Sequence, residues 1–241
     1  MVGAPGASTV GVRMRLTTYV IEERGALVPP TRLLVLLHGY DATEHDLTAL
    51  GPLLDPDVRF LIAGPRGPVA TADGSGAAWF SYGPLGPDAA SFHDSLRRLH
   101  DTVDALCAEH LMASDEVVVG GFSQGAAMAL AFGLGSSERT PPAGVLCLSG
   151  FLADVDELEY DWEVASHVPV LVQHGTRDRA VPIELGRDTA TALAHHGTPV
   201  TFEEFDMAHQ TTIESLTAAR DWLTAVRDGA VPSGGGPDAA T

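Results

Sequence analysis

VVVGGFSQGAAMAL, residues 117–130, is an apolar valine run joined to an alanine-rich run through a turn flanked by glycines. The valine run is typical of a buried strand, and the alanine-rich run favours a helix. Between them, residues 121–125 have the Gly-x-Ser-x-Gly pattern, in which a strained turn lifts a serine hydroxyl above a sheet. Glycine suits both ends of this turn because strand and helix pack closest there. The stretch predicts a nucleophile elbow with Ser123 at its tip; the alternative is a glycine-rich turn with an idle serine.

Short apolar runs and helical patterns alternate along the rest of the chain. Fully apolar strands that alternate with helices predict an α/β fold, with a mainly parallel central sheet covered by helices on both faces. Residues 10–22 are expected to add antiparallel edge strands. The predicted strands are 33–37, 59–63, 116–120, 144–148, 168–174 and 200–205, and the predicted helices are 46–54, 91–107 (with Ser91 as N-cap), 124–134, 183–195 and 211–227. In such sheets the reactive groups gather beyond the carboxyl ends of the strands.

The length and composition favour one domain. The chain has 241 residues, 45% of them hydrophobic, which suffices for one substantial core. We expect a single domain over 10–228, between a disordered arm (1–9) and a disordered tail (229–241) that are rich in Gly, Pro and Ala. The connections 64–90 and 149–167 are too short for a large cap domain, so we expect an open site.

The charge balance excludes several classes of partner and mechanism. Fourteen basic residues, all arginine, stand against 32 acidic ones, and the net charge of −18 repels nucleic acids and acidic membranes. Without lysine, phosphate-loop, Schiff-base and kinase-type lysine chemistry is excluded. No secretory signal or membrane-spanning run is visible, so we expect a cytoplasmic location. Cys107 and Cys147 are interpreted as buried, reduced thiols.

A serine nucleophile needs a general base and an acid that orients it. In this type of fold the chain order is serine, then acid, then histidine, each after a later strand. Asp178 follows the predicted strand 168–174, and His209 follows the predicted strand 200–205. Asp206 and Asp154 are rival acids. Asp206 is only three residues from His209 on one loop and is expected to point elsewhere, and Asp154 is the weaker rival.

Two backbone N–H groups are expected to stabilise the oxyanion of the reaction. One is that of Gln124, directly after the nucleophile, and the other is that of Tyr40, where Gly39 lets the loop turn toward the site. His38 is interpreted as a buried, hydrogen-bonded loop residue. No His-Glu-x-x-His or paired Cys-x-x-Cys motif is present, so no metal is expected. The candidate walls of a substrate pocket are Trp79, Tyr82, Leu85 and Phe151, although apolar loop residues more often fill the edge of a core.

Several blocks of the sequence together resemble a known family. The chain resembles the phospholipase/carboxylesterase family of α/β-hydrolases, which includes the acyl-protein thioesterases and small bacterial carboxylesterases. The resemblance covers about residues 30–225, and its blocks are Leu37-His38-Gly39-Tyr40 with Asp46-Leu47, residues 121–130, residues 174–178 with Val181-Pro182, Ala208-His209 and, more weakly, residues 76–80.

The resemblance implies a triad of Ser123, Asp178 and His209 with main-chain donors at Tyr40 and Gln124. It implies a cofactor-free serine hydrolase for carboxylic esters or acyl thioesters of small to medium acyl chains, acting through an acyl-enzyme. A lipase, a lysophospholipase, a peptidase and a catalytically silent ligand-binding protein on the same fold remain alternatives, and so does a homodimer. The chain departs from the common family pattern around the histidine, with alanine before it and glutamine after it, which affects the expected substrate pocket.

Overall fold

The computed structural model describes residues 15–16, 19–22, 25, 30–72, 74–84 and 86–230. The predicted N-terminal arm, and the predicted C-terminal tail apart from Gly229 and Ala230, lie outside these residues.

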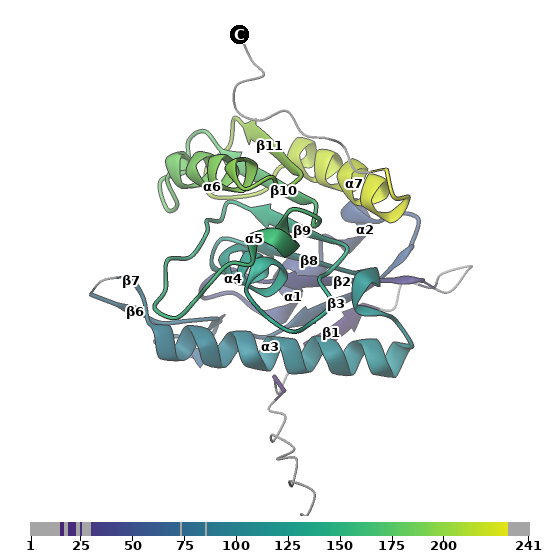
Figure 1. Ribbon diagram of the computed structural model, residues 1–241, viewed down its shortest axis with the longest axis horizontal. Helices are drawn as coiled ribbons and strands as arrows, with labels where there is room; N and C mark the ends of the chain where they lie inside the picture. Colours follow the sequence, from purple (N-terminus) through teal and green to yellow (C-terminus); the bar gives the residue numbers. More distant parts are fainter. Residues whose placement is uncertain are drawn as a thin grey trace, which may run out of the picture.

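A seven-stranded sheet forms the centre of the fold, with the strand order β1-β3-β2-β8-β9-β10-β11 (Figure 1). Only β1 is antiparallel, and it pairs with β3 at one edge of the sheet. The strands are β1 (Tyr19–Glu22), β2 (Arg32–Leu37), β3 (Phe60–Pro65), β8 (Val117–Phe122), β9 (Gly144–Leu148), β10 (Val170–Gly175) and β11 (Val200–Phe205). The six strands predicted between residues 33 and 205 are confirmed, with ends shifted by up to two residues. Of the predicted edge range 10–22, β1 is an antiparallel edge strand, and residues 10–14 and 17–18 lie outside the described residues.

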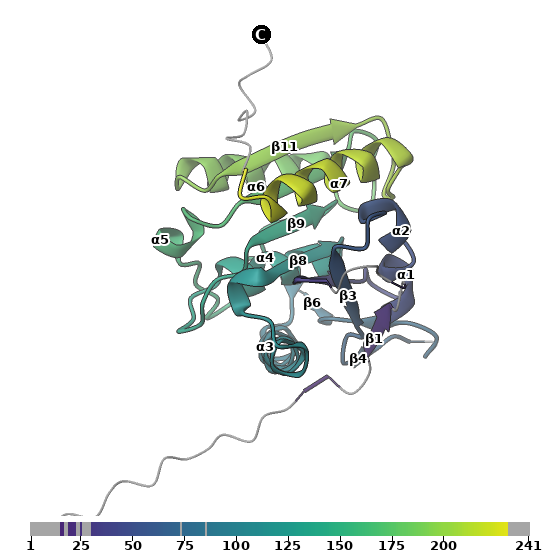
Figure 2. The same cartoon turned by 90° about the vertical axis from the view of Figure 1, so that its right-hand side faces the viewer.

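Helices cover both faces of the sheet (Figures 1 and 2). Side chains alternate between faces along each strand, so Val35 belongs to the core beneath α3, α4 and α6, whereas Leu34 and Leu36 belong to the core beneath α1, α2 and α7. The helices are α1 (Glu44–Thr48), α2 (Gly51–Leu54), α3 (Ala89–His110), α4 (Gln124–Leu134), α5 (Trp162–Ala165), α6 (Ile183–His195) and α7 (Ile213–Arg227).

Three predicted helices differ from the structure: α7 begins at Ile213 rather than at 211, and the other two differ more. The range 46–54 holds two short helices, because Pro52 in the first turn of α2 lacks the N–H that a continuous helix would need there. The long helix α3 begins earlier than predicted. Its N-cap is Asp88, whose carboxylate accepts the N–H of Ser91 at 2.9 Å, so Ser91 lies inside the first turn.

The connection between β3 and α3 contains two small hairpins that the sequence analysis did not predict. One pairs β4 (Val69–Ala70) with β5 (Ala77–Ala78), and the other pairs β6 (Tyr82–Gly83) with β7 (Gly86–Pro87). Each strand has two residues, too few for a period of two to be recognised.

The register of the parallel strands brings their carboxyl ends to one edge of the sheet. Leu37 at the end of β2 lies opposite Gly121, and Phe122 at the end of β8 lies opposite Leu148. Gly175 at the end of β10 lies opposite Phe205, the last residue of β11. The loops after β2, β8, β10 and β11 therefore leave the sheet along the same edge, and these loops carry the candidate site residues.

Candidate active site

Ser123 occupies the tight turn between β8 and α4. Its backbone has φ 55° and ψ −118°, a strained conformation for a residue with a β-carbon, and its N–H donates to Leu148 O at 2.9 Å. A β-carbon on Gly121 would lie 2.2 Å from Gly125 O, and one on Gly125 would lie 2.1 Å from Leu37 O. A side chain at either position would clash with backbone atoms, which cannot rotate away as side-chain atoms can. Both positions of the Gly-x-Ser-x-Gly pattern therefore require glycine.

The side chains of Ser123, His209 and Asp178 form a continuous hydrogen-bonded chain. His209 Nε2 lies 2.9 Å from Ser123 Oγ, and His209 Nδ1 lies 2.6 Å from Asp178 Oδ2. The imidazole also packs against Phe122, with 4.7 Å between ring centroids. The three residues come from loops after β8, β11 and β10, so the parallel register accounts for their meeting.

The two oxygens of Asp178 have different partners. Oδ1 accepts the backbone N–H groups of Ala180 and Val181, both at 2.9 Å, and Oδ2 faces His209. The carboxylate has no exposed surface. Because a carboxylate only accepts, His209 carries its proton on Nδ1, and the lone pair of Nε2 faces the serine hydroxyl. This tautomer is the one that can take the serine proton.

The rival acids lie elsewhere. The carboxylate of Asp206 is 83% exposed and pairs with Arg177 at 2.6 Å. Asp154 is exposed on the loop after β9. Among the described residues, Asp178 alone among the carboxylates lies within hydrogen-bonding distance of the His209 ring.

The loop after β2 reaches the nucleophile. A β-carbon on Gly39 would lie 3.7 Å from Ser123 Cβ, so the backbone before Tyr40 runs beside the serine. Gln124 is the first residue of α4, where a backbone N–H has no acceptor within the helix and the helix dipole favours negative charge. This arrangement suits the N–H groups of Tyr40 and Gln124 for an oxyanion.

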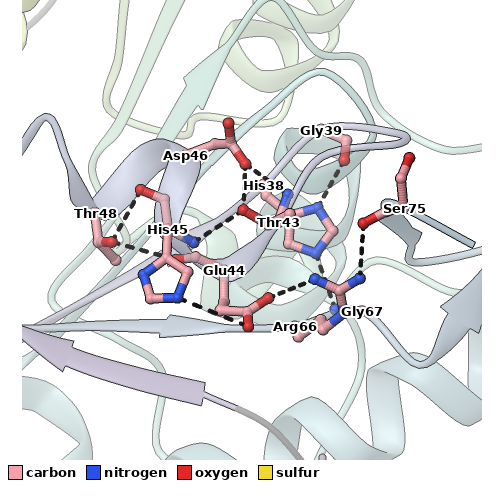
Figure 3. A network of polar contacts seen from close by, with 10 residues as sticks. All are labelled: His38, Gly39, Thr43, Glu44, His45, Asp46, Thr48, Arg66, Gly67 and Ser75. Atoms are coloured by element: carbon pink, nitrogen blue, oxygen red, sulfur yellow. Dashed lines mark hydrogen bonds and ion pairs between the residues drawn. The ribbon is translucent and has the colours of Figure 1, made fainter.

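His38 anchors the same loop (Figure 3). Its Nδ1 lies 2.7 Å from Gly39 O, and its Nε2 accepts the N–H of Gly67 at 3.0 Å. Burial lowers the pKa of His38, which keeps the lone pair on Nε2 available for Gly67. The indole N–H of Trp79 donates to His38 O at 2.9 Å. The interpretation of His38 as a buried, hydrogen-bonded loop residue is confirmed.

Arg66 ties the start of α1 to this region (Figure 3). Its guanidinium binds Glu44 at 2.7 Å and donates to Ser75 O at 3.4 Å. Thr43 caps α1, and Asp46 accepts its backbone N–H at 2.7 Å, forming a capping box. The loop between β2 and α1 is thus fixed on both sides.

The side chain of Gln124 has a role that the sequence analysis missed. Its Oε1 accepts the N–H of Trp79 and its Nε2 donates to Phe80 O, each at 2.7 Å. The amide is buried, so both ends of this polar group are paired with backbone. A glutamine at the start of an otherwise apolar helix was the signal available in the sequence.

The four candidate pocket walls lie in different environments. Trp79 is fully buried and holds the loop through its indole N–H, so it offers no surface to a substrate in this structure. Tyr82 is 57% exposed and meets Phe80 edge to face at 5.4 Å. Phe151 is half-buried against the core, and Leu85 lies outside the described residues. A groove of about 380 Å³ runs between the β6–β7 hairpin and residues 154–156, but its lining includes neither Tyr82 nor the side chains of Ser123, Asp178 and His209.

Other features bear on function only indirectly. Cys107 and Cys147 are free and buried, as predicted. Within the described residues, no three His, Cys, Asp or Glu side chains are grouped to hold a metal ion. None of the helices described above combines the length and the apolar character needed to cross a membrane.

The sheet topology and the strained serine between β8 and α4 define an α/β fold of the serine-nucleophile type. Residues 19–227 match the Phospholipase/Carboxylesterase family, and the chain belongs to this family. This confirms the family resemblance and the predicted α/β-hydrolase fold.

Relatives and solved structures agree with this assignment. The chain is 33% identical over 139 residues to acyl-protein thioesterase 1 of Neurospora crassa, a match covering 56% of this chain and 53% of that protein, about half its length. It is 25% identical over 206 residues to acyl-protein thioesterase 1 of Kluyveromyces lactis, covering 78% of this chain and 89% of that protein.

Two solved structures share the fold. A Bacillus cereus carboxylesterase superposes with a TM-score of 0.73 at 20% identity, over 86% of this chain and 93% of that one. Esterase PE8 superposes with a TM-score of 0.70 at 24% identity, over 87% and 97%.

Proposed function

We propose that this protein is a serine hydrolase that cleaves carboxylic esters and acyl thioesters through an acyl-enzyme. The observation that carries the proposal is the position of His209, whose two ring nitrogens lie 2.9 Å from Ser123 Oγ and 2.6 Å from Asp178 Oδ2. A serine hydroxyl becomes a competent nucleophile at neutral pH when such a base accepts its proton. The bound substrate supplies the carbonyl, and the chemistry needs no cofactor.

In the first half-reaction Ser123 Oγ attacks the carbonyl carbon while its proton moves to His209 Nε2. Asp178 stabilises the imidazolium, and the N–H groups of Tyr40 and Gln124 receive the oxyanion. The tetrahedral intermediate then breaks its bond to the leaving oxygen or sulfur, which takes the proton from Nε2. In the second half-reaction water attacks the acyl-enzyme with His209 again as base, and the acid and free Ser123 result.

The names of similar proteins also support the substrate class. The matched relatives are named acyl-protein thioesterases, and a structural neighbour is named a carboxylesterase.

The net charge and the two free thiols bear on the expected partners and cellular location. A net charge of −18 disfavours nucleic acid as a partner, so we expect small ester substrates. Two free, buried thiols are compatible with a reducing compartment, and we propose the cytoplasm.

A panel of matched substrates tests the proposal. The rates of hydrolysis of an aryl ester, an acyl thioester and an anilide, all with the same short acyl chain, are measured for the wild type, Ser123→Ala and Ser149→Ala. Ser149 is the matched control because it is buried and also has a positive φ, of 50°. We expect ester and thioester turnover with an acyl-enzyme burst, lost in Ser123→Ala and kept in Ser149→Ala. Efficient anilide cleavage would favour a peptidase, and binding without turnover a silent ligand-binding protein.

A further inference from the structure

A second histidine, His174, lies beside the acid of the site, and unlike His209 it is buried. It lies in β10, one residue before the strand ends, and has no exposed surface. Its Nε2 is 2.8 Å from Val181 O and 3.6 Å from Asp178 Oδ2. Because a carbonyl oxygen only accepts, Nε2 carries a proton and donates it to Val181.

This hydrogen bond closes the turn that holds the Asp178 carboxylate. The N–H of Val181 donates to Asp178 Oδ1, and its C=O accepts from His174, so both polar groups of Val181 serve the turn. The positive end of the Nε2–H dipole also faces Asp178 Oδ2, the oxygen that His209 binds. One imidazole therefore fixes the backbone around the carboxylate and favours its charge.

The other side of the imidazole is fixed by α6. A β-carbon on Gly186 would lie 2.4 Å from His174 Nδ1 and 2.9 Å from its Cγ, so the helix backbone packs directly on the ring. Glycine weakens a helix interior relative to alanine, and the contact with His174 explains its presence. Nδ1 is buried and has no hydrogen-bond partner in the described part of the chain. The ring has no room to turn away from Val181.

We infer that His174 is a positioning residue, which sets the place and orientation of the Asp178 carboxylate and through it the tautomer of His209. The inference rests on the proposed function. It differs from a purely structural role for a buried histidine, because that role predicts lost stability but unchanged turnover per folded molecule. The two roles separate when activity and folding are measured on the same variants.

The test compares His174→Leu with His174→Gln. Leucine leaves Val181 O unpaired, whereas the glutamine amide can reach the place of Nε2 and donate. We expect kcat of His174→Leu to fall roughly 10- to 100-fold, as loss of a buried hydrogen bond implies. KM is expected to change little, and His174→Gln to recover most of the loss. His100→Leu is the matched control, a largely buried histidine on α3 whose Nδ1 likewise finds no hydrogen-bond partner among the described residues.

A spectroscopic readout does not depend on turnover. The downfield proton resonance of the bond from His209 Nδ1–H to Asp178 is expected to weaken or move in His174→Leu and to be kept in His174→Gln and His100→Leu. Equal kcat in folded His174→Leu and wild type, with this resonance unchanged, would overturn the inference. Failure of the proposed function looks different: wild type and Ser123→Ala would then show equal activity, whatever residue 174 is.

Gly186→Ala gives a second approach if His174→Leu does not fold. Its new methyl group would press on the imidazole, so we expect a loss of kcat in the same direction. If Gly186→Ala lowers kcat by pressing on residue 174, it should lower kcat less in the His174→Gln background than in the wild type, because a flexible side chain there replaces the ring. A full and additive loss in that background contradicts the inference.

Discussion

Asp178→Asn changes one atom of the candidate triad and should disable it. Oδ1 of Asp178 is held by the N–H groups of Ala180 and Val181, which only donate. An asparagine at this position must place its carbonyl oxygen there, because its NH₂ group would face two other donors. The NH₂ group is then directed at His209 Nδ1, 2.6 Å from the present Oδ2.

The consequence is the wrong tautomer of His209. Nδ1 becomes an acceptor, so the proton resides on Nε2 and faces Ser123 Oγ, where it blocks proton transfer. The corresponding substitution in a Ser-His-Asp serine protease lowers kcat by about 10⁴. A similar loss is expected here, equivalent to about 5.5 kcal/mol of activation free energy.

The assay is steady-state hydrolysis of a short aryl ester, with folding checked by circular dichroism. Asp206→Asn is the matched control, because this exposed carboxylate binds Arg177 and does not contact His209. We expect it to keep nearly full activity. Near-normal turnover in Asp178→Asn, or a large loss in Asp206→Asn, would refute the assignment of the acid.

Three other variants test the surroundings of the site. Gln124→Leu keeps the backbone N–H but leaves Trp79 N–H and Phe80 C=O unpaired, so chemical denaturation should show a loss of about 3 kcal/mol in the free energy of unfolding. Arg177→Gln should lower kcat/KM less than about 3-fold, since the Arg177 and Asp206 side chains are 66% and 83% exposed, and high salt should mimic it in the wild type. Burial lowers the pKa of His100 to about 4. As the pH falls from 6 to 5, this histidine is protonated in the unfolded chain but stays neutral in the folded protein, so the free energy of unfolding falls by about 1 kcal/mol. In urea titrations, His100→Asn should remove this part of the pH dependence of stability.

The sequence predicted most of the sheet because its central strands are buried on both faces, as β9 is, and because the edge strand β11, of which only Val200 is buried, is still a short β-rich run. The runs at 144–148 and 200–205 are short, apolar or β-rich, and set off by turns, and the structure has strands at these positions. The Gly-x-Ser-x-Gly pattern placed Ser123, and the chain order of the family of folds then placed Asp178 and His209, since parallel strands end at the same edge.

Contacts between distant segments were not predictable in the same way. Helix α3 starts at Ala89 because of the cap at Asp88, and a serine three residues later competes as an equally good cap in the sequence. The hydrogen bond from Trp79 N–H to the Gln124 amide oxygen and the packing of Gly186 on His174 join segments far apart in the chain or on different elements. Such contacts leave no periodic signal, because they depend on how loops are placed by the whole fold.

Labelling with a fluorophosphonate, followed by mass spectrometry of the intact protein and its peptides, tests the central claim most directly. We expect one adduct per chain, on the peptide that contains Ser123, with its formation strongly slowed in His209→Ala and absent in Ser123→Ala. An adduct on another serine, or equal labelling rates in the wild type and His209→Ala, would contradict a histidine-activated Ser123.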